Sequence, residues 1–316
     1  GDWSPFWAAR DYLDDVDRIR ASVFVVHGLN DWNVKTKAFA EWWYRLDRYR
    51  VPRKIWLHNG GHGGPGPSTS PGAMAYKRAE NRWFDHELFG VENGIMDEPR
   101  STIQREDGTY ADEPDWPAPG ARYATLRLSA RSANAPGELS SGWSWNGRRT
   151  TQEFVDRGRE LDTDDVLIQG PDAARPDRLI YRTSSLGRDV RLSGTPWVNL
   201  RMSVENRNAA NLTAVLVDYG PLGSADPPVM VTRGWLDPQN RFSLSRSFPI
   251  RRGREYGFRW DLQPDDYLFR AGHRIGLVVV STDHDYTIRP APGTRLTLDP
   301  AHSRISLPVV GGGSAF

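Results

Sequence analysis

Two short apolar runs, each ending in a polar turn, constrain the fold of the first part of this chain most strongly. The runs are Ser-Val-Phe-Val-Val-His at 22–27 and Lys-Ile-Trp-Leu-His at 54–58. Runs of this length that end in Gly- and Asn-rich turns are typical of buried β-strands. Between them, residues 35–49 carry large apolar side chains at helical spacing, which predicts an amphipathic helix that ends before Pro52. Strand, helix and strand in this order predict parallel strands with a right-handed crossover.

A second helix is predicted after the second strand. Ser70 followed by Pro71 is typical of a helix start, because serine caps free backbone amides and proline fits the first turn. Gly90 is a natural C-terminal cap, since glycine readily adopts the left-handed conformation that ends many helices. The side chains expected to face inward from this helix are Tyr76, Ala79, Trp83 and Phe84.

Helical periodicity fades near residue 95, and short runs rich in β-branched and aromatic residues follow. Several of them alternate apolar and polar side chains, as half-buried antiparallel strands do. Many such strands separated by turns predict a β-sandwich or jelly roll. The expected fold class is therefore α/β plus all-β, with an α/β domain over 1–98, a jelly-roll β-sandwich over 99–316 and a crossover within 95–120. The runs that predict strands are 123–128, 190–194, 197–204, 212–219 and 274–281.

The turns that follow the two predicted parallel strands present an acid and a histidine. Asp31 follows the first strand, and His62 follows the second. The carboxyl ends of parallel strands border the crevice in which ligands bind in open α/β sheets. Asp31 followed by His62 matches the last two members of a hydrolase triad whose chain order is serine, acid, histidine. In that chemistry the histidine is the general base, and the acid orients it.

Other interpretations of these residues stay open at the level of the sequence. Asp31 is compatible with an Asx turn that caps the helix beginning near Lys35, and His62 with an ordinary loop residue. His58 is a competing base, although it lies at a strand end rather than in the loop. His27 is expected to be structural, because the His-Gly oxyanion loop that it resembles should precede the nucleophile.

The triad serine is expected to lie N-terminal to this chain, which reads as the later part of a larger protein. Ser144 sits in a segment, Gly142 to Gly147, that mimics a nucleophile elbow. Its second glycine is displaced by one position, and the segment follows both His62 and the change to β character. Ser144 is therefore not predicted to be the nucleophile.

Composition narrows the classes of partner and cofactor. A net charge of +1, from 41 basic and 40 acidic residues, gives no reason to expect nucleic acid or a membrane as a partner. The chain has no cysteine, which excludes disulfides, thiolate catalysis and cysteine-ligated zinc. The acidic segments 164–165 and 283–285 are better explained by solvated turns than by a metal, so no metal or cofactor is predicted. Cytoplasmic and secreted bacterial locations are both compatible with this composition, with a slight preference for secretion.

Four segments together resemble the Xaa-Pro dipeptidyl-peptidase family of serine peptidases, whose relatives include cocaine esterase and the α-amino-acid ester hydrolases. They are 7–12, 19–34, Trp42-Trp43 and 52–58, of which the part around Asp31 is the most specific. The resemblance extends over nearly the whole chain. It implies the C-terminal part of an α/β-hydrolase domain, followed by a jelly-roll domain.

The resemblance also implies an activity, the release of N-terminal dipeptides whose second residue is proline, through an acyl-enzyme. Asp31 corresponds to the triad acid and His62 to the triad base, while Trp32, Asn33 and Val34 are expected to line the substrate pocket. The family's serine, oxyanion-hole tyrosine and helical cap all precede the acid. This chain alone is therefore expected to be inactive, with the N-terminal part of the same enzyme as its partner.

Two further interpretations, and a possible homo-oligomer, stay open. An ester hydrolase of the α-amino-acid ester hydrolase or cocaine esterase type would use the same acid and base. A non-catalytic remnant would keep the jelly roll as a binding module, since fold alone does not determine function. The presence of both Asp31 and His62 favours an enzyme, because a remnant has no need of the pair.

Overall fold

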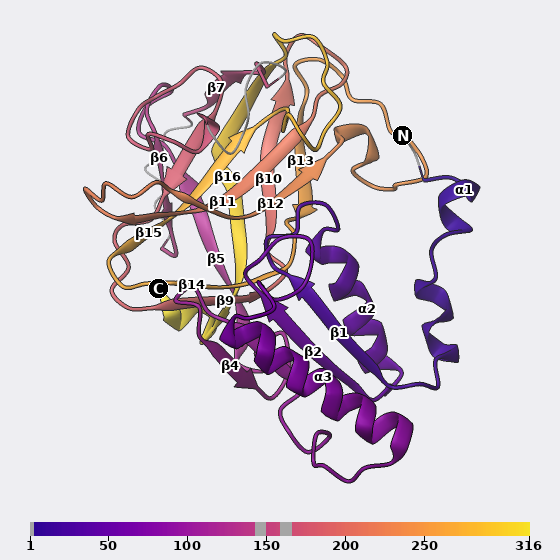
Figure 1. Cartoon of the computed structure of the whole chain (residues 1–316). Coiled ribbons are helices and arrows are strands. Elements are labelled where there is room, and N and C mark those ends of the chain that lie inside the picture. The colour runs from indigo at the N-terminus through magenta and orange to yellow at the C-terminus, as the bar shows by residue number, and fades with distance from the viewer. Residues whose placement is uncertain (1–2, 143–149, 159–165) are drawn as a thin grey trace.

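The computed structural model describes residues 3–142, 150–158 and 166–316 of the chain. Strands and helices alternate in the first part, as predicted, and strands dominate the rest (Figure 1). Among the described residues, no helix is both long and apolar enough to cross a membrane. The elements of the first part are α1 (Pro5–Ala8), a 3-10 helix (Leu13–Arg18), β1 (Val23–Gly28), α2 (Thr36–Arg48), β2 (Arg53–His58) and α3 (Pro71–Phe89).

The first sheet is larger than the sequence predicted. Its strand order is β1-β2-β3-β4, where β3 is Ser101–Gln104 and β4 is Tyr110–Glu113. The pairs β1·β2 and β2·β3 are parallel, and β4 adds an antiparallel edge. The sheet thus continues beyond the domain boundary expected between residues 98 and 99. We propose that the division of the chain falls between β4 and β5, inside the segment expected to be only a crossover.

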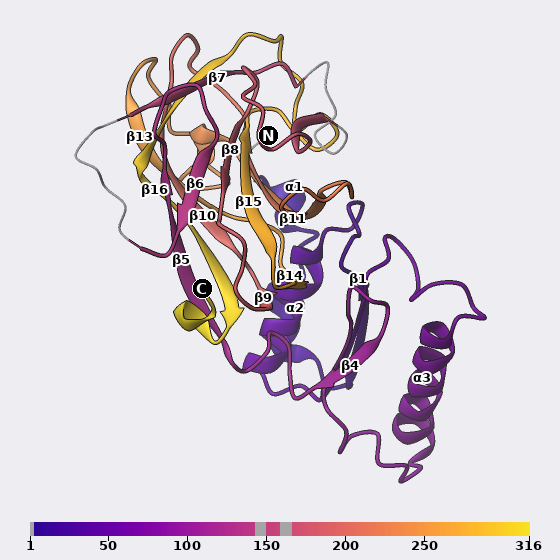
Figure 2. The same cartoon turned by 90° about the vertical axis from the view of Figure 1, so that its left-hand side faces the viewer.

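Helices α2 and α3 cover opposite faces of this sheet (Figure 2). Helix α2 buries Phe39, Ala40 and Trp43 in a core that it shares with Ile55 and Leu57 of β2. Burying this apolar stripe supplies most of the stability of such a helix, because short helices are marginal in water by themselves.

Helix α3 begins and ends as predicted. The Ser70 side chain accepts a hydrogen bond from the Ala73 amide at 3.2 Å, and Gly90 caps the C-terminus with a φ of 67°. Trp83 is buried, with its ring 5.3 Å from that of Phe24 on β1. The expectation that Phe84 faces inward is wrong, since its side chain is 49% exposed. Consecutive helical residues point about 100° apart, so Trp83 and Phe84 do not both face the sheet.

The second part is an all-β sandwich, and the fold class predicted from the sequence is confirmed. Its strand order is β12-β11-β15-β8-β6-β5-β16-β10-β13, with β7, β9 and β14 attached beside this path. All five predicted strands are present. The strands are β5 (Ala121–Ser129), β6 (Gly137–Ser140), β7 (Gln152–Val155), β8 (Leu179–Arg182), β9 (Val190–Gly194), β10 (Trp197–Val204), β11 (Leu212–Pro221), β12 (Val229–Leu236), β13 (Glu255–Asp261), β14 (Asp265–Phe269), β15 (His273–Val280) and β16 (Arg295–Val310).

The long strand β16 connects the two layers of the sandwich. It pairs with β10, β5, β7 and, at one position, β9. Alternate residues along the strands point into one shared core, as with Leu126 on β5, Leu200 on β10, Leu277 on β15 and Leu298 on β16. This inward alternation is the one that the sequence pattern predicted.

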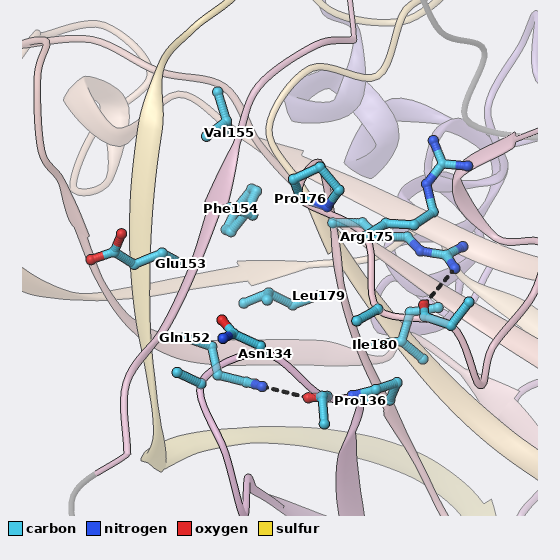
Figure 3. Close-up of a pocket in the computed structure, with 15 residues that line it drawn as sticks. Asn134, Pro136, Gln152, Glu153, Phe154, Val155, Arg175, Pro176, Leu179 and Ile180 are labelled. Atoms are coloured by element: carbon cyan, nitrogen blue, oxygen red, sulfur yellow. Dashed lines mark hydrogen bonds between the residues drawn. The ribbon is translucent and has the colours of Figure 1, made fainter.

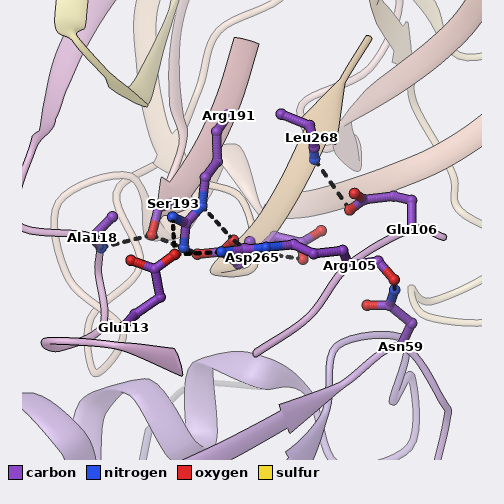
Figure 4. Close-up of polar contacts among 10 residues, drawn as sticks. Asn59, Arg105, Glu106, Glu113, Ala118, Arg191, Ser193, Asp265 and Leu268 are labelled. Atoms are coloured by element: carbon purple, nitrogen blue, oxygen red, sulfur yellow. Dashed lines mark hydrogen bonds and ion pairs between the residues drawn. The ribbon is translucent and has the colours of Figure 1, made fainter. Parts of the chain in front are cut away.

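Ion pairs around the buried Asp266 carboxylate join the two parts of the chain (Figure 4). Arg105, in the loop after β3, donates to Asp266 on β14 at 2.8 Å. Arg191, on β9, pairs with Glu113 of β4 at 2.6 Å and with Asp266 at 2.9 Å. Ser193 donates to the other Asp266 oxygen at 2.7 Å. Because removing one partner of a buried charge pair is strongly unfavourable, this network holds the sandwich in one orientation against the α/β part.

Candidate functional site

The loops that follow β1 and β2 touch each other. The Leu29 amide donates to the His58 carbonyl at 2.7 Å, and the Asn30 amide donates to the Gly60 carbonyl at 3.2 Å. Gly28 is essential to this approach, because a Cβ at Gly28 would lie 2.3 Å from the Gly60 carbonyl oxygen and 2.4 Å from that of Gly61. The two loops are therefore held together as one unit at the carboxyl edge of the sheet.

Asp31 and His62 meet across these loops. His62 Nδ1 lies 2.9 Å from Asp31 Oδ2, so the two residues form a hydrogen bond. The other carboxylate oxygen, Oδ1, accepts from the backbone amides of Asn33 and Val34, both at 2.9 Å. Both oxygens of the nearly buried carboxylate are occupied, which fixes the direction in which Asp31 faces His62.

The electrostatics of the pair determine where the histidine proton lies. Burial raises the pKa of Asp31, but hydrogen bonds from His62 and from the Val34 and Asn33 amides outweigh it and hold the pKa below its usual value. An ionised carboxylate only accepts hydrogen bonds, so His62 Nδ1 must carry the proton. His62 Nε2 is then free to accept one. The His62 side chain is 62% exposed, and a substrate group can approach it.

The structure also addresses the alternatives left open for Asp31. Its Oδ1 does form an Asx-type turn with the following amides, while Oδ2 bonds His62, so both interpretations describe one residue. Asp31 does not cap α2, since the residue before that helix is Lys35. The first-turn amide of Lys37 is bonded instead by Gln263 of the sandwich, at 3.1 Å.

The two other histidines of this region lie differently. His58 is buried at the end of β2, where its Nδ1 accepts from the Gly60 amide at 3.1 Å. Burial lowers the pKa of His58, which favours a neutral ring that supports the loop. The His27 ring packs against Phe39 with 4.9 Å between centroids. Neither ring contacts the Asp31 carboxylate through a hydrogen bond in the described part of the chain.

Of the three residues expected to line a substrate pocket, Trp32 faces away from the other two. Asn33 is exposed, and Val34 is 43% exposed, both next to Asp31. The Trp32 ring instead packs on the sandwich, with the Arg233 guanidinium carbon 4.4 Å from its centroid. Sequence reasoning missed Arg233 and Gln263, because no local signal links residues so distant along the chain.

The acidic segments considered as metal ligands have other partners or lie outside the description. Asp283 pairs with Arg233 at 3.2 Å and accepts from the Trp235 indole at 2.8 Å. In the described ranges no three His, Asp or Glu side chains are grouped as metal ligands would be. Ser144 and the pair at 164–165 lie outside the described residues.

One cavity borders the loop that carries Asp31, and another lies apart from it. One, of about 240 Å³, lies behind the loops and is lined by Leu29, Asn30 and Asn59, and from the sandwich by Asp265 and Tyr267 among others. The other, of about 340 Å³, is within the sandwich (Figure 3). None of the residues predicted to form the functional site lines the second cavity, which lies instead among 133–136, 152–155 and 173–180.

Comparison with known families matches two segments of the chain to two family models. Residues 93–312 match the X-Pro dipeptidyl-peptidase C-terminal non-catalytic domain, and residues 1–64 match X-Pro dipeptidyl-peptidase of the S15 family. Relatives from Bacillus cereus and Bacillus anthracis, both named "Putative Xaa-Pro dipeptidyl-peptidase", are 44% and 46% identical over 98% of this chain. The chain spans about half the length of these relatives, 50% and 49% respectively.

Solved structures share the fold. An aminopeptidase from a marine sediment Thaumarchaeota archaeon superposes with a TM-score of 0.78 at 16% identity, over 98% of this chain and 58% of its own. An α-amino acid ester hydrolase superposes with a TM-score of 0.76 at 19% identity, over 98% and 59%. At such low identity these likenesses establish architecture alone. The family model that matches residues 93–312, together with the one that matches residues 1–64, shows that the chain belongs to the X-Pro dipeptidyl-peptidase family.

Proposed function

We propose that this chain is the C-terminal portion of a serine exopeptidase that releases N-terminal Xaa-Pro dipeptides through an acyl-enzyme. The observation that carries the proposal is the 2.9 Å hydrogen bond between His62 Nδ1 and an ionised, oriented Asp31. In this mechanism His62 Nε2 takes the serine proton as the serine oxygen attacks the peptide carbonyl. It then gives that proton to the departing amine, and Asp31 stabilises the imidazolium in between.

The serine would come from an N-terminal portion of the same enzyme, packed along β1. Among the described residues, β1 pairs with β2 alone and forms one edge of its sheet. Its Val23, Phe24 and Val25 are only half-buried, and Val26 is 36% exposed, whereas every residue of β2 is buried. An uncharged apolar strand is typical of the middle of a parallel sheet rather than of a bare edge. We infer that one or more strands of the N-terminal portion continue the sheet there.

The substrate would approach the exposed edge of His62. Asn33 and Val34, exposed beside Asp31, are proposed to line its pocket. A substrate role for Trp32 is less favoured, because its ring is in contact with Arg233. The reaction as proposed needs side chains only, with no metal or cofactor.

Hydrolysis of a Gly-Pro chromogenic amide by the complete enzyme tests the proposal. Asp31→Asn and His62→Ala are each expected to lower kcat by on the order of 10³-fold to 10⁴-fold or more, because each removes a triad member. His86→Ala is the matched control, since His86 bonds the Val91 carbonyl near the end of α3, away from these loops. Full activity in His62→Ala would refute the role of this histidine.

The fragment itself offers a second test. The 316-residue chain is expected to be inactive, and addition of the N-terminal portion is expected to restore turnover. Intact mass and N-terminal sequencing of the active preparation identify which polypeptides are present. Cleavage by these 316 residues alone would refute the assignment of the serine to an N-terminal portion and return attention to Ser144.

An ester hydrolase is the alternative that uses the same acid and base. The ratio of kcat/KM for a Gly-Pro anilide to that for an amino-acid ester separates the two, since a proline-specific peptidase favours the anilide. A non-catalytic remnant, in which the jelly-roll domain only binds a ligand, predicts that neither substrate is cleaved and that Asp31→Asn changes nothing.

A further inference from the structure

A buried charge pair lies where the sandwich meets the loop that carries Asp31. Arg233 of β12 and Asp283, after β15, are both buried, and Arg233 Nη1 lies 3.2 Å from Asp283 Oδ2. The Trp235 indole donates to the same oxygen at 2.8 Å. A buried guanidinium whose carboxylate partner is also fixed is a rigid surface for a neighbour to pack on.

That neighbour is Trp32, the residue directly after Asp31. The Arg233 guanidinium carbon lies 4.4 Å from the centroid of the Trp32 ring and 4.0 Å from that of Tyr286. The cation is therefore in contact with one ring from each part of the chain. Such an arrangement attracts each ring electrostatically to the cation, and it does so most strongly where water is excluded.

A second contact holds the other end of the same loop. The Lys37 amide, in the first turn of α2, donates to the Gln263 side chain at 3.1 Å. First-turn amides have no partner within their own helix, and Lys35, before α2, provides no side-chain cap. The backbone amide of Gln263 donates to the backbone carbonyl of Arg233 at 2.8 Å, so the Trp32 contact and the Lys37 contact come from one connected unit.

We propose that this unit, Arg233 with Gln263, positions the Asp31 carboxylate, so that the sandwich helps to build the catalytic geometry although it contributes no catalytic residue. The inference rests on the proposed function. Asp31 Oδ1 is held by the amides of Asn33 and Val34, which lie between the two points of attachment. Loosening either attachment lets those amides move, and the carboxylate then loses its fixed direction toward His62.

Three substitutions in the complete enzyme test this positioning role. Trp32→Leu removes the ring, Trp32→Phe keeps one, and Gln263→Met removes the acceptor while keeping side-chain length. Trp197→Leu is the matched control, because Trp197 also packs under an arginine, Arg259 at 4.1 Å, but on β10.

Trp32→Leu and Gln263→Met are expected to lower kcat by on the order of 10-fold to 10²-fold. KM is expected to change little, because the displaced group, the Asp31 carboxylate, orients His62 and does not bind the substrate. The pH profile of kcat/KM is expected to differ from that of the wild type, since the carboxylate that orients His62 is no longer fixed. Trp32→Phe is expected to retain much of the activity, and Trp197→Leu to match the wild type in both readouts.

A measurement independent of turnover separates this inference from the proposed function. In ¹⁵N-histidine-labelled enzyme, the His62 Nδ1 proton bonded to Asp31 is expected to give a downfield resonance. It should weaken in Trp32→Leu and Gln263→Met and persist in Trp197→Leu, whether or not any peptide is cleaved. Circular dichroism is used to check that each variant is folded. Persistence of the His62 proton signal and of the wild-type pH profile in folded Gln263→Met would overturn the positioning role.

Discussion

Gly28→Ala is the change that most directly tests how the loops that carry Asp31 and His62 are held together. The added Cβ would lie 2.3 Å from the Gly60 carbonyl oxygen and 2.4 Å from that of Gly61. Both distances are about 1 Å shorter than ordinary van der Waals contact. At such distances the two atoms repel each other steeply. Gly28 does not have a positive φ, so alanine is able to adopt its backbone conformation. Any loss of stability or activity in Gly28→Ala is therefore due to the steric clash of the added Cβ.

The structure indicates how large the effect should be. Both obstacles are backbone carbonyls, and the Gly60 oxygen also accepts from the Asn30 amide, so neither is able to rotate away as a side chain does. The loops must separate instead, at a cost of about 1–3 kcal/mol in the free energy of unfolding. A shift of about 1 Å between Asp31 and His62 breaks their hydrogen bond and is expected to lower kcat by on the order of 10²-fold.

Urea unfolding and hydrolysis of the Gly-Pro amide measure the two effects in the complete enzyme. Gly64→Ala is the matched control, because a Cβ at Gly64 meets no atom within 4 Å, although it lies in the same glycine-rich loop. The control is expected to match the wild type in both assays. Wild-type stability and turnover in Gly28→Ala would show that the loops do not approach as described, and would refute the reasoning.

Three further predictions concern stability. Because folding lowers the pKa of Asp31, its ionised carboxylate stabilises the folded state above the unfolded pKa, and this stabilisation is lost as the pH falls through the folded pKa. Asp31→Asn is therefore expected to make the free energy of unfolding less dependent on pH below about pH 4. Ser70→Ala removes the cap on the Ala73 amide and should cost about 1 kcal/mol in a urea titration, with kcat unchanged. Trp83→Ala should cost about 3–5 kcal/mol, whereas Phe84→Ser, one residue away but exposed, should stay within about 0.5 kcal/mol in thermal unfolding. An equal loss in the last two variants would contradict the orientation of α3.

Much of the architecture was predictable because it depends on local patterns. The alternation along the sandwich strands and the helical spacing of Phe39 and Trp43 follow from the geometry of strands and helices. Ser70 and Gly90 were recognisable as caps for the same reason. Strands β3 and β4 were not, since each has four residues and no long apolar run, and only their pairing with β2 and with each other assigns them to the first sheet.

The sequence by itself determined the order of the elements, the fold class and the order of Asp31 and His62 along the chain. Only the tertiary structure decided that these two side chains form a hydrogen bond, through the contact of two glycine-bearing loops. It also decided that Lys37 and Gln263, 226 positions apart, share a hydrogen bond beside the acid loop. Periodicity describes neighbours a few residues apart, whereas contacts between two separately packed parts of a chain depend on how their whole surfaces fit together.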